Sequence, residues 1–168
     1  MIKIIVTGPE SSGKTTLCKL LSEHFNTPFT EEYAREYLNK QDEKYTQSDL
    51  KRIAKGQLLK EKKEEELLIC DTDLITIKIW SEYKYGNCNN WILEQIAKQK
   101  TENRFYILCK PDIPWEEDPL RENPTNREEL FEIYKEELEK LKHNYSIIEG
   151  EERIKNSIAK ISSLISNN

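Results

Sequence analysis

The sequence predicts a three-layer α/β fold, in which a parallel five-stranded sheet carries helices on both faces. Two observations predict it. Five short apolar runs alternate with longer segments whose apolar residues recur at helical spacing. A glycine-containing turn separates the first apolar run from the first helical segment. Because parallel strands need long crossover connections, and helices supply them, this alternation favours a parallel sheet.

The five predicted strands are apolar runs that end at polar residues. They are expected at residues 3–7, 28–31, 67–70, 105–109 and 145–148. Leu67-Leu68-Ile69-Cys70 is the clearest of them and ends in Asp71. Parallel sheets bind ligands at the carboxyl ends of their strands, so the chemistry is expected there.

The helices are predicted from apolar spacing and from capping residues. They are expected at residues 14–24, 32–39, 46 to about 65, 74–83, 91–98, 127–141 and 154–165. Thr46 stands three residues before Asp49, and Thr125 three before Glu128; both patterns resemble capping boxes. Residues 60–66 form a charge run that we interpret as the solvated end of the third helix.

One segment, residues 111–126, fits neither pattern. It contains four prolines, Trp115 and several carboxylates, and we expect it to form a loop or lid. With this lid, the chain is expected to form one domain over residues 1–168.

Composition limits the classes of partner. Hydrophobic residues make up 36% of the chain, charged residues 34%, and the net charge is −5. We therefore expect no bulk attraction to nucleic acid or to a membrane, and no apolar run approaches the ~20 residues of a membrane span. The four cysteines form no CxxC pair, so free thiols in a reducing, cytoplasmic compartment are expected.

The turn after the first strand matches the pattern GxxxxGK[ST] at Gly8, Gly13, Lys14 and Thr15. Between a strand and a helix, this pattern predicts a P-loop NTPase fold that binds a nucleoside triphosphate with Mg²⁺. Backbone amides and the helix N-terminus hold phosphate oxygens, Lys14 reaches the β and γ phosphates, and Thr15 coordinates Mg²⁺. Further contributors are expected at Glu10, Ser11, Ser12 and Thr16.

Acidic residues follow the second and third strands. Asp71 can hold Mg²⁺ or accept a proton from a substrate hydroxyl, and Asp73 can share either role. The alternative for this pair is a helix N-cap. Glu32 and Arg35 are candidates for contact with a sugar hydroxyl or phosphate, and the alternative for the acids there is stabilisation of a helix N-terminus.

Two arginines of the lid region, Arg121 and Arg127, are candidates for neutralising a transferring phosphoryl group. The alternative is ordinary surface pairing with nearby acids. Trp115 can stack on a base or pack at the root of the loop, and Asp118 can anchor the lid or bind substrate.

Together these segments resemble the ribosylnicotinamide kinase domain of NadR-type proteins, within the P-loop nucleoside kinases. The segments that carry the resemblance stand in family order: Gly8-Pro9-Glu10-Ser11-Ser12-Gly13-Lys14-Thr15, Glu32-Tyr33-Ala34-Arg35-Glu36, Asp71-Thr72-Asp73-Leu74-Ile75-Thr76, then Trp115, Asp118, Leu120, Arg121 and Arg127.

The resemblance implies ATP-dependent phosphorylation of nicotinamide riboside on its 5′ hydroxyl. It assigns substrate contacts to Glu32, Tyr33, Arg35, Asp73, Trp115 and Asp118. Family members often carry an adenylyltransferase and sometimes a DNA-binding module before this domain; because the phosphate loop begins at residue 8, we expect neither here. Where the family has an aromatic residue that stacks on the nicotinamide, this chain has Glu31, so Tyr33 or Trp115 would take that role.

The leading hypothesis is thus a nucleoside kinase. The alternative is an ATPase or GTPase that acts as a nucleotide-switched binding module, but the base-reading NKxD motif of GTPases is absent from the sequence. The sequence leaves open the preference for ATP or GTP, the general base among Asp71, Asp73 and Glu32, and a homo-oligomeric state.

Overall fold

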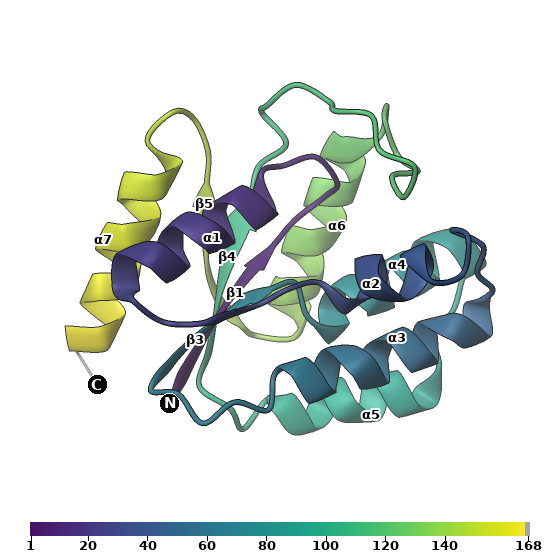
Figure 1. The fold of residues 1–168 in the computed structure, drawn as a ribbon, viewed down its shortest axis with the longest axis horizontal. Helices are drawn as coiled ribbons and strands as arrows, with labels where there is room; N and C mark the ends of the chain where they lie inside the picture. The colour runs from purple at the N-terminus through teal and green to yellow at the C-terminus, as the bar shows by residue number, and fades with distance from the viewer. Residues whose placement is uncertain (167–168) are drawn as a thin grey trace.

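The computed structural model describes residues 1–166, and its centre is a five-stranded parallel sheet in the order β2-β3-β1-β4-β5 (Figure 1). The strands are β1 (Ile2–Thr7), β2 (Phe29–Thr30), β3 (Leu67–Asp71), β4 (Arg104–Cys109) and β5 (Asn144–Ile148). The predicted parallel five-stranded sheet is confirmed. Strands β2 and β3 lie on one side of β1, whereas β4 and β5 lie on the other side. The strand order therefore reverses at β1, and the loop that follows β1 lies at this point.

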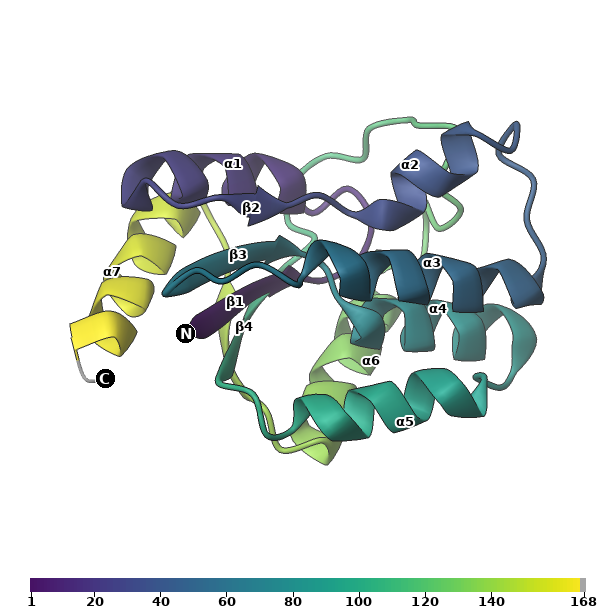
Figure 2. The same cartoon turned by 60° about the horizontal axis from the view of Figure 1, so that its bottom comes forward.

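Seven helices are formed within residues 1–166, and they cover both faces of the sheet (Figures 1 and 2). One face carries α1 (Lys14–Phe25) and α7 (Arg153–Ser166). The other side carries α2 (Tyr33–Asn39), α3 (Gln47–Lys60), α4 (Leu74–Tyr85), α5 (Asn90–Gln99) and α6 (Arg127–Lys140).

Alternation along β1 divides the core into two parts. Ile4 and Val6 pack with Leu17 and Leu21 of α1, whereas Ile5 packs with the apolar residues of the opposite helices. Successive side chains of a strand point to opposite faces, so a strand that is buried throughout feeds both layers. This packing fixes β1 rigidly and holds the loop that follows it in place.

Two helix boundaries differ from the sequence expectation. Helix α3 ends at Lys60 rather than near residue 65, because Glu61 turns inward, is 2% exposed and pairs with the buried guanidinium of Arg104. The charge run is thus mostly loop, not a helix end. The capping box at Thr46 and Asp49 is confirmed, but the one predicted at Thr125 is wrong: Asn126 is the N-cap of α6 and forms no side-chain capping bond.

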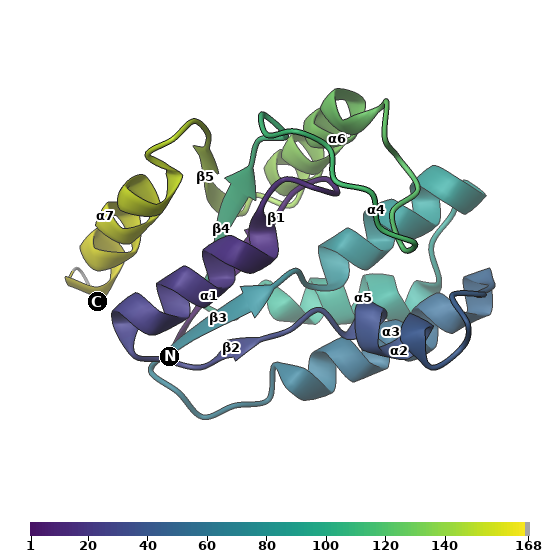
Figure 3. The ribbon, with the colours of Figure 1, turned by 45° about the horizontal axis from the view of Figure 1, so that its top comes forward.

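Residues 110–126 form no helix or strand and pass beside the loop between β1 and α1 (Figure 3). The contacts that join this segment to the loop are described below. No helix within residues 1–166 combines the length and the apolar character that crossing a bilayer requires. All four cysteines are free thiols; Cys18, Cys70 and Cys109 are buried, and Cys88 is half-buried.

Candidate functional site

The loop between β1 and α1 turns at two glycines that no other residue would replace without strain. Gly8 has φ 137°, and a Cβ there would lie 2.6 Å from the carbonyl oxygen of Cys109. Gly13 has φ 80° and stands at the N-cap of α1. Glycine tolerates such angles because it has no Cβ. The loop can therefore pass close to β4 and begin α1 with free amides, the arrangement that binds phosphate at helix N-termini.

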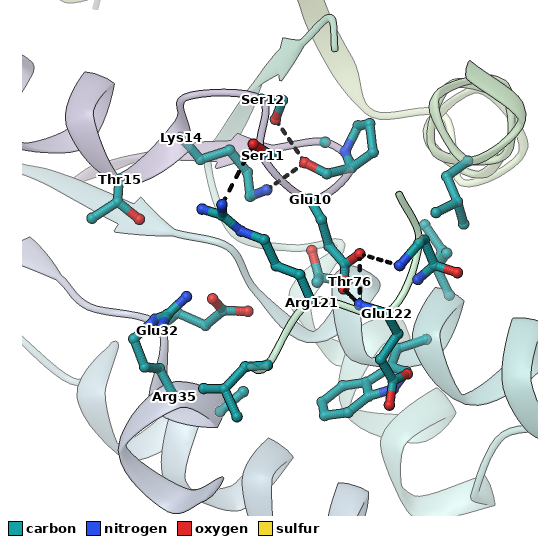
Figure 4. Close-up of a pocket in the computed structure, with 18 of the residues that line it drawn as sticks. Glu10, Ser11, Ser12, Lys14, Thr15, Glu32, Arg35, Thr76, Arg121 and Glu122 are labelled. Atoms are coloured by element: carbon teal, nitrogen blue, oxygen red, sulfur yellow. Dashed lines mark hydrogen bonds between the residues drawn. The ribbon is translucent and has the colours of Figure 1, made fainter. Parts of the chain in front are cut away.

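Polar side chains of the loop make well-defined contacts. Lys14 Nζ and Ser12 Oγ both donate to the carbonyl oxygen of Pro9, each at 2.7 Å, as the dashed lines in Figure 4 mark. Thr15 Oγ1 donates to Asp71 Oδ2 at 2.6 Å. The second carboxylate oxygen of Asp71 is buried and forms no hydrogen bond within the described chain.

A cavity of about 670 Å³ opens from this loop. Residues 8–16 line one end, and residues of α2, α4, α6 and the 113–123 segment line the rest. Ala34, Leu38, Ile79 and Leu130 give it apolar walls, with Trp80 and Tyr83 of α4 beside them. Apolar walls around a few polar groups are typical of small-molecule sites.

Glu32 lines this cavity directly after β2. Burial raises the pKa of its carboxyl and the charge of Asp71 adds to the shift, while Lys14 and Arg35 partly oppose it; together these effects bring the pKa to about 7. Burial also raises the pKa of Asp71, against the hydrogen bond from Thr15. A carboxyl with a pKa near neutrality can accept and release a proton at physiological pH.

The segment of residues 111–126, predicted as a lid, is bonded to the phosphate loop. The carboxylate of Glu10 accepts from the backbone amides of Glu122, at 3.1 Å, and Asn123, at 2.8 Å. Ser11 Oγ accepts from the backbone amide of Glu116 at 3.0 Å. Two residues of the loop therefore position the segment over the cavity.

Three arginines also contact the phosphate loop or the segment of residues 111–126. Arg121 extends across the cavity toward Ser11 (Figure 4), whose Oγ lies 3.5 Å from its Nη1. Arg127 instead donates to the carbonyl oxygens of Ser11, at 2.9 Å, and Ile113, at 3.0 Å. Arg35, which lines the cavity, pairs with Asp118 at 2.9 Å. Of the two arginines predicted in the lid region, Arg121 thus lines the cavity, whereas Arg127, like Asp118, fixes the segment from outside.

The structure brings most of the predicted site residues to this one cavity. Its lining includes Gly8, Glu10, Ser11, Ser12, Gly13, Lys14, Thr15, Thr16, Glu32, Arg35 and Arg121. Asp71 lies beside them through Thr15. Tyr33, Asp73, Trp115, Asp118 and Arg127 are not part of the lining.

The assignment of Asp73 to the site is corrected. Its side chain is fully buried, caps α4 by accepting from the amide of Ile75, and accepts from Tyr106 Oη at 2.7 Å. The bond from Ile75 goes to Oδ1, whereas Tyr106 and Arg104 Nη1, the latter at 3.2 Å, both donate to Oδ2. The N-cap interpretation is therefore the right one for Asp73, because these bonds turn its carboxylate away from the cavity and into the core.

The two aromatic residues expected to stack on a substrate ring are also placed elsewhere. Tyr33 packs against α3, where a Cβ on Gly56 would lie 2.0 Å from its ring. Trp115 lies beside the guanidinium groups of Arg121 and Arg127, with its indole N–H bonded to Glu117. Trp80 and Tyr83 were missed as site residues; their helical spacing with Thr76 and Ile79 was the available signal.

Arg153, at the start of α7, was also missed. Its Nη1 donates to the carbonyl oxygen of Ser12 at 2.7 Å, and its Nη2 pairs with Asp112. It thus supports the phosphate loop from the side opposite the cavity's α4 wall. No sequence signal marks it, because 141 positions separate it from Ser12.

A parallel sheet with this strand order, a GxxxxGK[ST] loop after its central strand, and a threonine–aspartate pair beside that loop define the class of P-loop proteins. Within that class, the chain belongs to the AAA domain family, whose model matches residues 3–153.

Comparison with known proteins gives more specific similarities. The chain is 28% identical to the trifunctional NAD biosynthesis/regulator protein NadR of Escherichia coli K12, across 89% of this chain and 38% of that protein. The chain thus spans well under half the length of this relative. A crystal structure of a NadR protein in complex with NR superposes with a TM-score of 0.68 at 22% identity, covering 96% of this chain and 51% of the other.

The second structural similarity is to deoxyadenosine kinase from M. mycoides, in a structure with its products bound. The TM-score is 0.64 at 16% identity, covering 99% of this chain and the whole of that one. At these identities the two structures support the fold, and they agree with the P-loop kinase architecture predicted from the sequence.

Proposed function

We propose that this protein is an ATP-dependent nucleoside kinase, with nicotinamide riboside as its substrate and nicotinamide mononucleotide as its product. One observation carries the proposal: a single cavity holds the phosphate loop, the carboxyl of Glu32 and the guanidinium of Arg121. A kinase needs these three in one place, since its catalysis is mostly positioning and charge stabilisation.

The proposed reaction uses the residues as they lie. Glu32 accepts the proton of the 5′ hydroxyl, whose oxygen forms a bond to the γ phosphorus. The bond from that phosphorus to the β–γ bridging oxygen breaks, and ADP leaves with the electron pair. Lys14 and Arg121 stabilise the negative charge on the transferring group.

Thr15 and Asp71 are the residues that would hold Mg²⁺. Their oxygen donors suit this ion, and the buried, unpartnered carboxylate oxygen of Asp71 has no other acceptor role in the described chain. Bound there, Mg²⁺ would supply charge neutralisation at the β and γ phosphates. Within residues 1–166 no cluster of three histidine, cysteine or acidic side chains suggests a different metal site.

Support for nicotinamide riboside comes from similarity. The 28%-identical relative is an NAD biosynthesis protein, and the 0.68 TM-score structure is a NadR protein in complex with NR. The proposal covers the kinase step only, because the aligned region spans 38% of that relative. Trp80 and Tyr83 of α4 replace Tyr33 and Trp115 as the proposed aromatic contacts of the substrate ring.

The test is an ADP-release assay with ATP, Mg²⁺ and a nucleoside panel that includes nicotinamide riboside and deoxyadenosine. We expect release to depend on nicotinamide riboside, with the monophosphate identified by mass spectrometry. Release that no nucleoside changes, but that a macromolecular partner raises, would instead favour a nucleotide-switched module. Dependence on another nucleoside alone would retain the kinase and reject the named substrate.

A further inference from the structure

The end of the cavity near the C-terminal half of α4 holds a compact hydrogen-bonded group that the phosphate chemistry does not use. Glu122 Oε1 accepts from Lys84 Nζ at 2.8 Å and from Tyr45 Oη at 2.8 Å. Tyr45 Oη in turn accepts from Trp80 Nε1 at 2.9 Å and from Lys84 Nζ. Lys84, Glu122 and Trp80 line the cavity, whereas Tyr45 supports them from behind.

Counting hydrogen-bonding capacity shows what remains for a ligand. Tyr45 Oη is saturated, since it accepts two bonds and donates one. Lys84 uses two of its three N–H groups, on Tyr45 and Glu122. Within residues 1–166, Glu122 Oε2 accepts no hydrogen bond. Within the described chain, one N–H of Lys84 and Oε2 of Glu122 are therefore left for a ligand, on two groups that are joined by the 2.8 Å contact between Lys84 Nζ and Glu122 Oε1.

The charge of Lys84 and the neutral hydroxyl of Tyr45 are retained near neutral pH. Burial raises the pKa of Tyr45 to about 12, so it remains a neutral donor. Burial lowers the pKa of Lys84, but hydrogen bonds to Glu122 and Tyr45 outweigh it and leave the pKa raised. The Lys84 ammonium therefore persists beside Glu122.

We propose that Lys84 and Glu122 recognise a neutral primary carboxamide on the ring of the substrate and discriminate against the corresponding carboxylate. The amide oxygen accepts from Lys84, and the amide N–H₂ donates to Glu122 Oε2. A carboxylate satisfies Lys84 equally, but its second oxygen faces the negative charge of Glu122, and a like-charge contact is costly. This inference rests on the proposed function, because it assigns the ring of the riboside to the α4 end of the cavity.

The experiment measures binding and turnover separately. Isothermal calorimetry compares nicotinamide riboside with nicotinic acid riboside on the wild type and on Glu122→Gln and Lys84→Met. The wild type is expected to bind the amide about tenfold more tightly or better. Glu122→Gln removes the repulsion and tightens binding of the acid about tenfold, whereas Lys84→Met weakens the amide about tenfold.

The matched control is Glu152→Gln, which removes one partner of an exposed ion pair, Glu152–Lys155, at the N-terminus of α7. It is expected to leave both affinities unchanged. Equal affinity of the wild type for the two ribosides, or an amide preference that Glu122→Gln leaves intact, overturns the inference.

Turnover of the same ribosides distinguishes this inference from the proposed function. Phosphorylation of both at equal efficiency, with no change in Glu122→Gln, overturns the role of the pair and leaves the kinase standing. Binding with the expected preference, but without phosphorylation of either riboside, supports the pair and overturns the kinase proposal.

Discussion

Thr15 donates a 2.6 Å hydrogen bond to Asp71, and this bond joins the first turn of α1 to the end of β3. The two residues are 56 positions apart in the sequence. Because the hydroxyl engages only one carboxylate oxygen, the other is left unpartnered in a side chain that is 2% exposed overall. A buried, unsatisfied carboxylate oxygen is costly, so this arrangement favours binding of a cation there.

The first prediction tests Asp71. Asp71→Asn is expected to lower kcat about 100-fold or more, since it removes charge that the metal requires. Affinity for ATP analogues without Mg²⁺ should change less than threefold, because Lys14 and the loop amides hold the phosphates. Fluorescent-nucleotide titration and ADP release measure the two effects. Full turnover in the variant would reject the assignment of Asp71.

The second prediction is a pH dependence. With a pKa of about 7, Glu32 is protonated below that pH and is a base above it. The kcat/KM of the wild type should therefore rise through about pH 7, while Glu32→Gln should lose this rise and show a kcat/KM about 100-fold lower at pH 8. Glu36→Gln, at an exposed position of α2, is the control. A wild-type profile that is flat from pH 6 to 8 would contradict a base at Glu32.

The third prediction concerns stability at the same residue. The folded pKa of about 7 exceeds the ordinary 4.5, so the folded chain binds more protons than the unfolded chain between these values. Stability contributed by this group therefore falls as the pH rises from about 4.5 to about 7. Glu32→Gln should raise the free energy of unfolding at pH 8 by roughly 3 kcal/mol, with little change at pH 4. Urea titrations at the two pH values measure it; an equal gain at both would count against a raised pKa.

The fourth prediction separates Asp73 from Asp71. Removing one member of a buried ion cluster leaves its partner charge unpaired, so Asp73→Ala should lower the free energy of unfolding by about 3–5 kcal/mol. In the folded fraction, KM should stay near its wild-type value. Chemical unfolding and steady-state kinetics at low temperature measure the two effects. A stable Asp73→Ala variant without turnover would restore the catalytic assignment.

The fifth prediction compares two arginines. Arg121→Ala should lower kcat about 100-fold with little loss of stability, because its guanidinium serves the transferring phosphate. Arg127→Ala should mainly lower thermal stability and raise KM, because it removes bonds between α6, the phosphate loop and residue 113. Thermal melts and kinetics on both variants test this difference. Equal losses of kcat in the two would argue against a distinct role for Arg121.

Local patterns were sufficient for the elements and the phosphate loop. The motif from Gly8 to Thr15 is contiguous, and its glycines, lysine and threonine each have one physical role, so the loop was predicted residue by residue. The sheet was also predicted from local sequence. A strand that is buried on both faces is a continuous run of apolar residues, and such runs alternate with helical segments in this chain. The end of α3 was misplaced because Glu61, one charge in a run of charges, is buried by a partner 43 positions away.

What the sequence by itself determined is therefore the class of fold and the place of the triphosphate site, because both depend on neighbours along the chain. Only the tertiary structure decided which acid is bonded to the phosphate loop and which is buried with Arg104, and that α4 rather than Tyr33 or Trp115 supplies the aromatic wall. Asp71 and Asp73 are two residues apart, yet one is bonded to Thr15 and the other to Tyr106. The direction in which each carboxylate points is set by the packing of distant elements, and no local pattern encodes it.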